Sequence, residues 1–99
     1  MRVGTVVAAE AFPQARKPAY KLTIDFGPEL GTKRTSAQIT ELYEPPALVG
    51  QQVVAVVNFP PKQIGPFLSE CLVLGSVAPD GTVTLLTPTQ PAANGLRIG

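Results

Sequence analysis

Alternation of apolar and polar residues along the first third of the chain predicts short β-strands. The clearest case is Tyr20–Phe26, where every second residue is apolar. Such a pattern is typical of an antiparallel strand with one buried face. Arg2–Phe12 is rich in β-formers and predicts a first strand, and Lys33–Ile39 predicts a more polar third strand. The prolines and glycines of Phe12–Pro18 and Gly27–Gly31 predict a loop and a turn between them.

The second half carries longer apolar runs. Gln52–Val57 and Cys71–Val77 are almost continuously apolar, which is typical of strands buried on both faces. Thr40–Val49 predicts a short helix, entered at a pair of prolines and ended by a glycine. Val83–Leu86 follows a strong turn signal, Pro79–Gly81, and completes a predicted hairpin.

The segment Asn58–Gly75 is the most informative, because a long connection with three prolines joins the apolar run that ends at Val57 to the one that begins at Cys71. Proline fixes φ and removes a backbone donor, so the sequence predicts a stiff loop that does not pair as a strand. A stiff loop is a suitable support for functional side chains. This one carries the polar residues Asn58, Lys62 and Ser69 and two aromatic residues expected to be exposed, Phe59 and Phe67.

The order of elements is strand–strand–strand–helix–strand–strand. It predicts an all-β protein, a five-stranded OB-fold barrel with a short helix between strands three and four. The pattern alone leaves another small β-barrel or a β-sandwich open. Residues 1–99 are expected to form a single domain. The tail Thr87–Gly99 is loop-like, and its Leu96 and Ile98 are expected to dock on the body or on a partner.

The amino-acid composition disfavours several kinds of catalytic and metal site. The chain has no histidine and a single cysteine, Cys71, within an apolar run. Histidine is the commonest general base and metal ligand, so hydrolytic triads and zinc sites are poor interpretations. We therefore expect no catalytic residue, no metal and no cofactor. The lone buried thiol fits a reducing compartment, and neither a leader nor a membrane-spanning run is evident, which predicts a soluble cytoplasmic protein without membrane insertion.

Charge is low in total but uneven along the chain. The net charge is +1, whereas residues 1–34 hold six of the eight cations. A basic half on a nearly neutral protein fits a modest surface for a polyanion. The alternative is that these charges only solvate strand edges. If RNA binds, the expected phosphate contacts are Arg16, Lys17, Lys33 and Arg34.

Several segments together resemble the CsaA proteins of the tRNA-binding-domain family, which also supplies appended domains to some methionyl-tRNA synthetases. The resemblance runs over nearly the whole chain. It is carried by Arg2-Val-Gly-Thr-Val-Val7, Phe12-Pro-Gln-Ala-Arg-Lys-Pro-Ala-Tyr-Lys-Leu22, Ile24-Asp-Phe-Gly27, Ser36-Ala-Gln-Ile-Thr40, Val54-Ala-Val-Val-Asn-Phe-Pro-Pro61 and Ser69-Glu-Cys-Leu-Val-Leu-Gly75.

The resemblance implies an OB-fold, a homodimer, binding of tRNA and a role as a protein-export chaperone for unfolded client polypeptides. In the wider family an Asn after the fourth strand, a Lys in the following loop and a Ser before the last apolar run recur at the RNA-facing mouth. Asn58, Lys62 and Ser69 hold those places here. Relatives usually begin with a short helix before Arg-Val-Gly, so the dimer is expected to be weaker or to use other contacts, such as Asn94–Ile98.

Each candidate also has a simpler interpretation. Lys62 can be a solvated loop lysine, Asn58 a loop cap, and Ser69 a partner for the backbone. The aromatic pair Phe59 and Phe67, with Ile64, would stack bases or hold client polypeptides in an apolar groove that includes Leu68; the alternative is that they plug the barrel end. At the level of function the alternative is a pure chaperone, a peptide-binding module in which RNA binding is vestigial.

Overall fold

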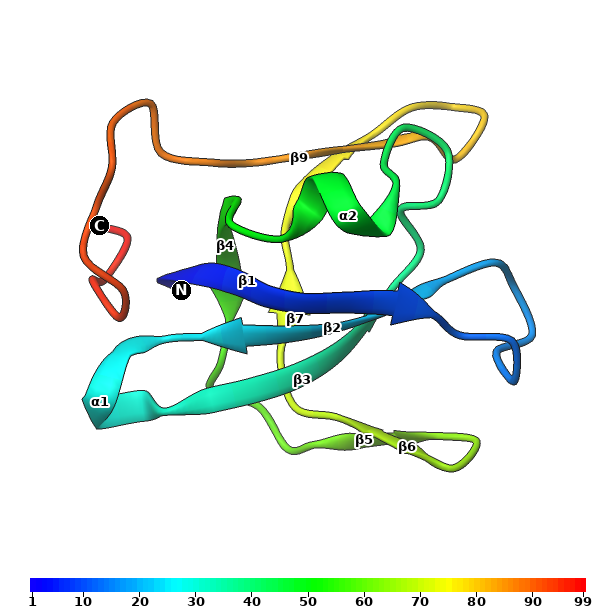
Figure 1. Cartoon of the computed structure of the whole chain (residues 1–99), viewed down its shortest axis with the longest axis horizontal. Helices are drawn as coiled ribbons and strands as arrows, with labels where there is room; N and C mark the ends of the chain where they lie inside the picture. The colour runs from blue at the N-terminus through cyan, green and yellow to red at the C-terminus, as the bar shows by residue number, and fades with distance from the viewer.

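The computed structural model describes all residues, 1–99, and its centre is a five-stranded antiparallel barrel. The strands are β1 (Arg2–Ala11), β2 (Tyr20–Asp25), β3 (Thr32–Ala37), β4 (Gln52–Val56) and β7 (Leu72–Val73), in the order β3-β2-β1-β4-β7. The helix α2 (Pro45–Leu48) lies between β3 and β4 in sequence and packs on β1 (Figure 1). The predicted OB-fold is confirmed.

One long strand, β1, joins the two halves of the barrel. It pairs with β4 through Arg2–Thr5 and with β2 through Thr5–Ala11, and the second register shifts between Val6 and Ala8. Such a bulge adds a residue and bends the strand, which lets one strand serve two neighbours. Gly4 leaves room for the core side chains, because an added Cβ would stand 2.5 Å from the Ile24 side chain and 2.8 Å from the Phe26 ring.

The main core cluster is aliphatic apart from Phe26, Tyr20 and Cys71. Alternation on β2 holds as predicted, since Tyr20, Leu22 and Ile24 point inward while the residues between them are half-buried. The run Gln52–Val57 buries three consecutive residues, Val53 to Ala55, which fits the predicted strand buried on both faces. The main cluster contains Val6, Tyr20, Leu22, Ile24, Phe26, Ala37, Ile39, Leu48, Val53, Ala55 and Cys71.

Single hydrogen bonds, from backbone and side chain, complete the barrel where strand pairing does not. The edge strands β3 and β7 share no ladder. Instead the Glu70 amide donates to the Arg34 carbonyl at 2.7 Å, and the Thr35 hydroxyl donates to the Cys71 carbonyl at 2.6 Å. The barrel is therefore nearly closed, and its seam lies between the edge strands β3 and β7.

The proline-containing connection between Val57 and Cys71 was predicted to be an unpaired loop, and this is wrong. It contains a hairpin of β5 (Lys62–Ile64) and β6 (Phe67–Ser69), paired in register. The prolines do not prevent it, because Pro60 and Pro61 precede β5 and Pro66 lies in the turn. Gly65 precedes Pro66 with φ +56°, a left-handed conformation that favours glycine.

The apolar run Cys71–Val77 was predicted to be one strand buried on both faces, and this is also wrong. It forms two short strands, β7 and β8 (Gly75–Val77), and β8 leaves the barrel to pair with β9 (Val83–Leu85) as the predicted hairpin. Leu72 is 52% exposed and Val77 is 71% exposed. The apolar side chains of this run therefore form an exposed apolar surface and not part of the core.

Two smaller differences concern the turns and the tail. The predicted turn at Gly27–Gly31 contains one helical turn, α1 (Gly27–Leu30), and the helix predicted within Thr40–Val49 is limited to α2. The tail docks by its backbone: the Val3 amide donates to the Leu96 carbonyl and the Ile98 amide to the Met1 carbonyl. The two chain ends therefore lie side by side (Figure 1).

Candidate nucleic-acid interface

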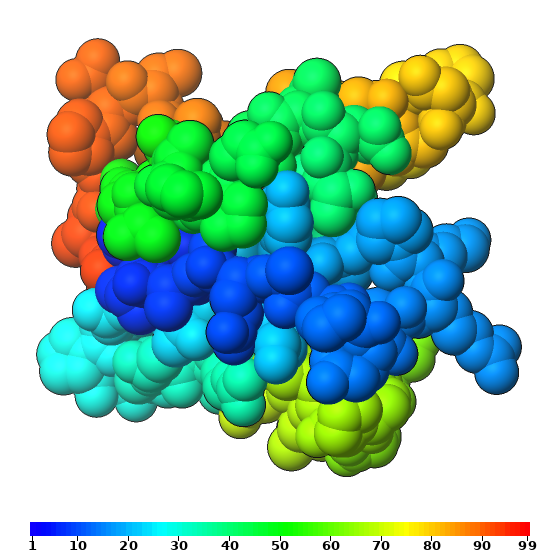
Figure 2. All heavy atoms as spheres, turned by 45° about the vertical axis from the view of Figure 1, so that its right-hand side comes forward, coloured from blue at the N-terminus to red at the C-terminus, as the bar shows by residue number.

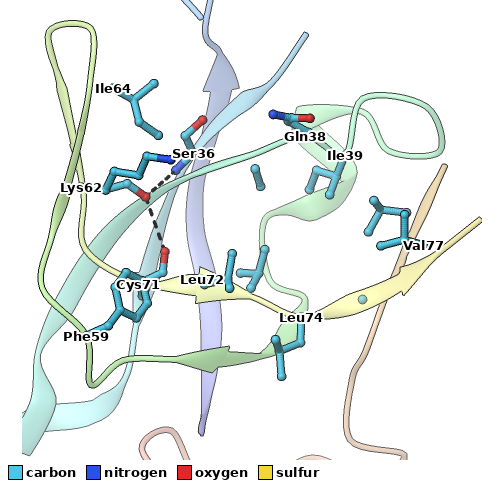
Figure 3. Close-up of a pocket in the computed structure, with 15 residues that line it drawn as sticks. Ser36, Gln38, Ile39, Phe59, Lys62, Ile64, Cys71, Leu72, Leu74 and Val77 are labelled. Atoms are coloured by element: carbon cyan, nitrogen blue, oxygen red, sulfur yellow. Dashed lines mark hydrogen bonds between the residues drawn. The ribbon is translucent and has the colours of Figure 1, made fainter. Parts of the chain in front are cut away.

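A groove of about 620 Å³ opens beside the seam of the barrel (Figure 3). Its walls come from β3 and the segment after it, from the β5–β6 hairpin, and from β7 with β8. Most of its lining is apolar. The lining residues are Ser36, Ala37, Gln38, Ile39, Phe59, Lys62, Ile64, Ser69, Cys71, Leu72, Val73, Leu74, Gly75, Val77 and Val83.

Lys62 is the one charged residue in this lining. It is the first residue of β5 and is exposed, and its side chain extends toward Ser36 on β3 (Figure 3). No carboxylate lines the groove, so the ammonium has no competing partner there. An apolar groove with one unopposed cation suits a ligand that carries both flat apolar surface and negative charge.

Ser69 belongs to the floor of the groove rather than to its rim. It is buried, and its hydroxyl accepts a hydrogen bond from the Ser36 amide at 3.3 Å. The same hydroxyl lies 3.2 Å from the hydroxyl of Thr35, which is fully buried and donates to the Cys71 carbonyl. This small network attaches β3 to β6 and so fixes the shape of the groove.

Cys71 contributes packing and no reactive thiolate. Burial raises the pKa of the Cys71 thiol to about 11, although a hydrogen bond with Thr35 opposes the shift. The thiol is therefore protonated at neutral pH, and the nucleophilic form of cysteine is the thiolate. The residue lines the groove as a small apolar group, in agreement with the prediction of a buried, inert cysteine.

The structure brings several predicted site residues together. Lys62, Ile64, Phe59 and Ser69 all line the groove, and Figure 3 shows the first three around one opening. Asn58 is exposed and directly precedes Phe59, so it lies at the edge of the groove without lining it.

The predicted phosphate contacts do not line the groove. Arg16 and Lys17 are exposed in the loop between β1 and β2, and the hairpin turn at Gly65 approaches this loop at Gln14. Figure 2 shows the atoms of the hairpin packed against that part of the chain. Lys33 and Arg34 lie on β3; Lys33 is half-buried, whereas Arg34 is exposed.

Phe67 was expected to be exposed, and this is wrong. It is 4% exposed and packs on Phe12, with ring centroids 5.3 Å apart, in a second cluster that also includes Ala19. Its burial follows from the hairpin, which folds back onto the start of the β1–β2 loop. Leu68 is 45% exposed, but it does not line the groove and so does not belong to the expected apolar wall.

Sequence reasoning named only four of the fifteen lining residues as site candidates, and Ser36, Gln38, Leu72 and Leu74 are among those it missed. Ser36 and Gln38 alternate with the buried Thr35 and Ala37 on and just after β3, so their side chains face outward at the seam. That alternation was the available signal. Leu72 and Leu74 were read as core because they stand in an apolar run, although both line the groove.

Comparison with known proteins gives a consistent picture. The model of the family described as "Putative tRNA binding domain" matches residues 1–97. The chain belongs to the tRNA-binding-domain family. It is 39% identical to methionine–tRNA ligase 1 of Sorangium cellulosum over 99% of its own length, but that match spans only 14% of the ligase.

Solved structures place it near the CsaA proteins, as the sequence predicts. The crystal structure of the chaperone CsaA from Bacillus anthracis str. Ames has 57% identity and a TM-score of 0.94, and the match covers 99% of this chain and 88% of that one. The CsaA chaperone protein from Picrophilus torridus has 50% identity and a TM-score of 0.91, with coverage of 99% and 89%. In our structure, no helix has the length and apolar character needed to span a membrane.

Proposed function

We propose that this protein binds tRNA, with the groove beside the barrel seam as the centre of the contact. The observation that carries the proposal is the lining of the groove: apolar walls with Lys62 as the one charged side chain. Bases offer flat apolar faces and the backbone offers phosphate, so an unpaired stretch of tRNA has both features that the groove suits. Membership of the tRNA-binding-domain family supports the proposal.

Within this proposal the predicted residues take different roles. Lys62 contacts a phosphate from its position on the rim. Asn58 donates to and accepts from a base edge or a 2′-hydroxyl, which its exposed amide permits. Ser69 is already engaged by Ser36 and Thr35, so it acts by holding the groove in shape. Phe59 and Ile64 supply apolar contact.

The outlying cations extend the contact beyond the groove. Arg16, Lys17, Lys33 and Arg34 lie on the β1–β2 loop and on β3, the two parts of the molecule nearest the hairpin. In our proposal they bind further phosphates. Their electrostatic contribution does not depend on sequence, and salt weakens it.

A second candidate function is the binding of unfolded client polypeptides during protein export. The two structural relatives described above are named as chaperones, and the groove is mostly apolar. Client segments would bury apolar side chains against Phe59, Leu72 and their neighbours. A protein with this activity alone, in which RNA binding is vestigial, is the alternative to the first proposal.

We further propose that the protein is not an enzyme, that it works as a homodimer and that it is cytoplasmic. The chain contains no histidine and its thiol is protonated at neutral pH, which supports a binding role. Exposed apolar side chains at the paired chain ends support self-association. A free, buried cysteine fits a reducing compartment.

Fluorescence anisotropy of labelled bulk tRNA across a salt series tests both functions, with a reduced and alkylated, unfolded reporter protein as competitor. About four phosphate contacts to unpaired strand would give a slope of log affinity against log salt of about −3. Saturable, salt-steep binding that the unfolded protein displaces is expected if RNA and clients share the groove. Salt-steep binding without displacement would separate the client surface from the groove. Absence of tRNA binding at low salt would leave the chaperone function alone.

A further inference from the structure

An arginine lies against an aromatic ring just outside the groove. The guanidinium carbon of Arg34 is 4.5 Å from the ring centroid of Phe67, which is buried beneath it. Arg34 itself is exposed, so the side of the guanidinium away from the ring is open to solvent. A planar guanidinium stacks on aromatic faces, and RNA-binding proteins use guanidinium planes as stacking surfaces for unpaired bases.

The backbone of Arg34 is fixed on both sides. Its amide donates to a carboxylate oxygen of Glu70 at 3.0 Å, and its carbonyl accepts from the Glu70 amide at 2.7 Å. The ring of Phe67 then restricts the side chain. A long arginine side chain ordinarily loses conformational freedom when it binds a ligand, and a side chain held in place beforehand loses less.

The guanidinium has no acceptor within the protein. None of its nitrogens donates a hydrogen bond to another residue, and no carboxylate lies within ion-pair distance. Lys21, the other cation over this aromatic pair, differs in this respect, because its ammonium lies 3.6 Å from the carboxylate of Glu10. Arg34 therefore presents both a flat face and free donors to solvent.

Its position continues the groove. Arg34 and Ser36 are two residues apart on β3 and share a face, and Ser36 lines the groove. Same-face neighbours on a strand are separated by about 7 Å, so a strand of RNA leaving the groove along β3 would pass over Arg34. We propose that Arg34, supported by Phe67, is a stacking site for one unpaired base of the bound RNA. This proposal rests on the proposed function, and it assigns Arg34 more than a phosphate contact.

The test compares an oligouridylate of about ten nucleotides with an abasic ribose-phosphate strand of equal length and charge, a length within the site sizes known for OB-folds. Their affinities are measured for the wild-type protein, for Arg34→Lys and for Arg97→Lys. Lysine keeps the charge and loses the plane. Arg97→Lys is the matched control, because Arg97 lies on the tail outside the groove and stacks on no ring.

We expect the wild-type protein to prefer the oligouridylate by about fivefold or more, the contribution of one stacked base. Arg34→Lys should reduce that preference by about fivefold, the share of one stacked base, and retain its affinity for the abasic strand and its salt slope, whereas Arg97→Lys should behave as wild type. Phe67→Leu, if its melting temperature shows that it is folded, should reduce the preference in the same way, because the ring that holds Arg34 is gone.

The contrary outcomes are distinct. If Arg34→Lys keeps the full preference, or weakens both strands equally, Arg34 is no stacking site, even though RNA binding stands. If the wild-type protein binds both strands equally well, base contact fails at Arg34 and in the groove alike, and only the phosphate contacts of the proposed function survive. If the wild-type protein binds neither strand nor tRNA at low salt, both proposals fail.

Discussion

The residue type of Lys62 does not distinguish it from a solvated loop lysine. Its position in the groove lining does. It is the one charge in an otherwise neutral groove lining, so any anion that enters meets a single unopposed cation. Its direct cross-strand partner is Ser69, the last residue of β6. One residue pair thus joins a rim charge to the buried network of the seam.

Removal of the Lys62 charge should weaken tRNA binding and flatten its salt dependence. We expect Lys62→Gln to lower affinity about fivefold to tenfold at low salt and to reduce the magnitude of the salt slope by about one, as for the loss of one phosphate contact. Gln90→Glu changes the net charge by the same amount on an exposed part of the tail outside the groove. It should have little effect in the same anisotropy series. Equal losses of tRNA affinity in the two variants would show that the net charge of the protein determines binding and that the position of Lys62 does not.

Thr35 is the residue that most directly holds the seam. Its hydroxyl donates to the Cys71 carbonyl and is hydrogen-bonded to the Ser69 hydroxyl, and all three residues are buried. Thr35→Val keeps the shape and leaves those partners short of a hydrogen bond, which should cost about 1–3 kcal/mol in the free energy of unfolding. For a domain of this size each kcal/mol lowers the melting temperature by about 4–8 °C.

The matched control for Thr35 is Thr23→Val on β2. Thr23 is half-buried on the outer face of the barrel, and its hydroxyl makes no hydrogen bond within the protein. This change should leave the melting temperature nearly unaltered in a calorimetric scan. If both valine variants melt alike, the seam network contributes nothing measurable to stability.

At the scale of elements, the strands with a clear periodic pattern could be predicted from the sequence. β1 and β2 were predicted to within one residue at each end, β2 because a barrel strand with one buried face alternates and β1 because it is rich in β-formers. The β5–β6 hairpin was missed because prolines were treated as excluding strands, whereas here they flank the paired positions. Burial of Phe67 could not be predicted, since it depends on where that hairpin folds back.

The same reasoning explains which part of the site could be foreseen. The rim residues Lys62 and Asn58 stand out as polar residues in a proline-rich segment. The opposite wall does not, because an apolar run looks alike whether it fills a core or lines a groove. Leu72 shows the difficulty: only the departure of β8 from the barrel leaves it half exposed.

That wall should bind clients if the second candidate function holds. Leu72→Ser removes apolar contact from the groove, and we expect the affinity for the unfolded reporter protein to fall about fivefold, since burying a leucine contributes about 1.5–3 kcal/mol when complete. Its affinity for tRNA should fall less, by about twofold, because a wall contact to the bases is lost while the serine alters no charge and the phosphate contacts remain. Leu42→Ser is the control, as Leu42 is 57% exposed and lies outside the groove. A loss of client affinity in Leu42→Ser alone would place the client surface elsewhere.

At the scale of the whole molecule, the chain ends form an apolar region separate from the groove. The tail runs beside the start of β1, with Arg97 bridged to Arg2, and this arrangement leaves large apolar side chains uncovered at that end. Met1 is 50% exposed and Leu96 is 52% exposed, with Ile98 close to them in sequence and 36% exposed. Neighbouring exposed apolar residues are a common sign of an interface between proteins.

We therefore expect self-association through the paired ends. Light scattering after size exclusion should give about 21 kDa, twice the chain mass of 10.4 kDa. Leu96→Glu should shift that value to the monomer, because an isologous contact would bring the two introduced charges together, whereas Leu42→Glu should remain a dimer. A monomeric wild-type protein would refute the dimer, and a dimeric Leu96→Glu would move its interface away from the tail.

Because the groove lies apart from these ends, a monomeric Leu96→Glu should bind short oligouridylate as the wild type does. Long tRNA that contacts both copies should bind it more weakly, since the second contact no longer benefits from the first.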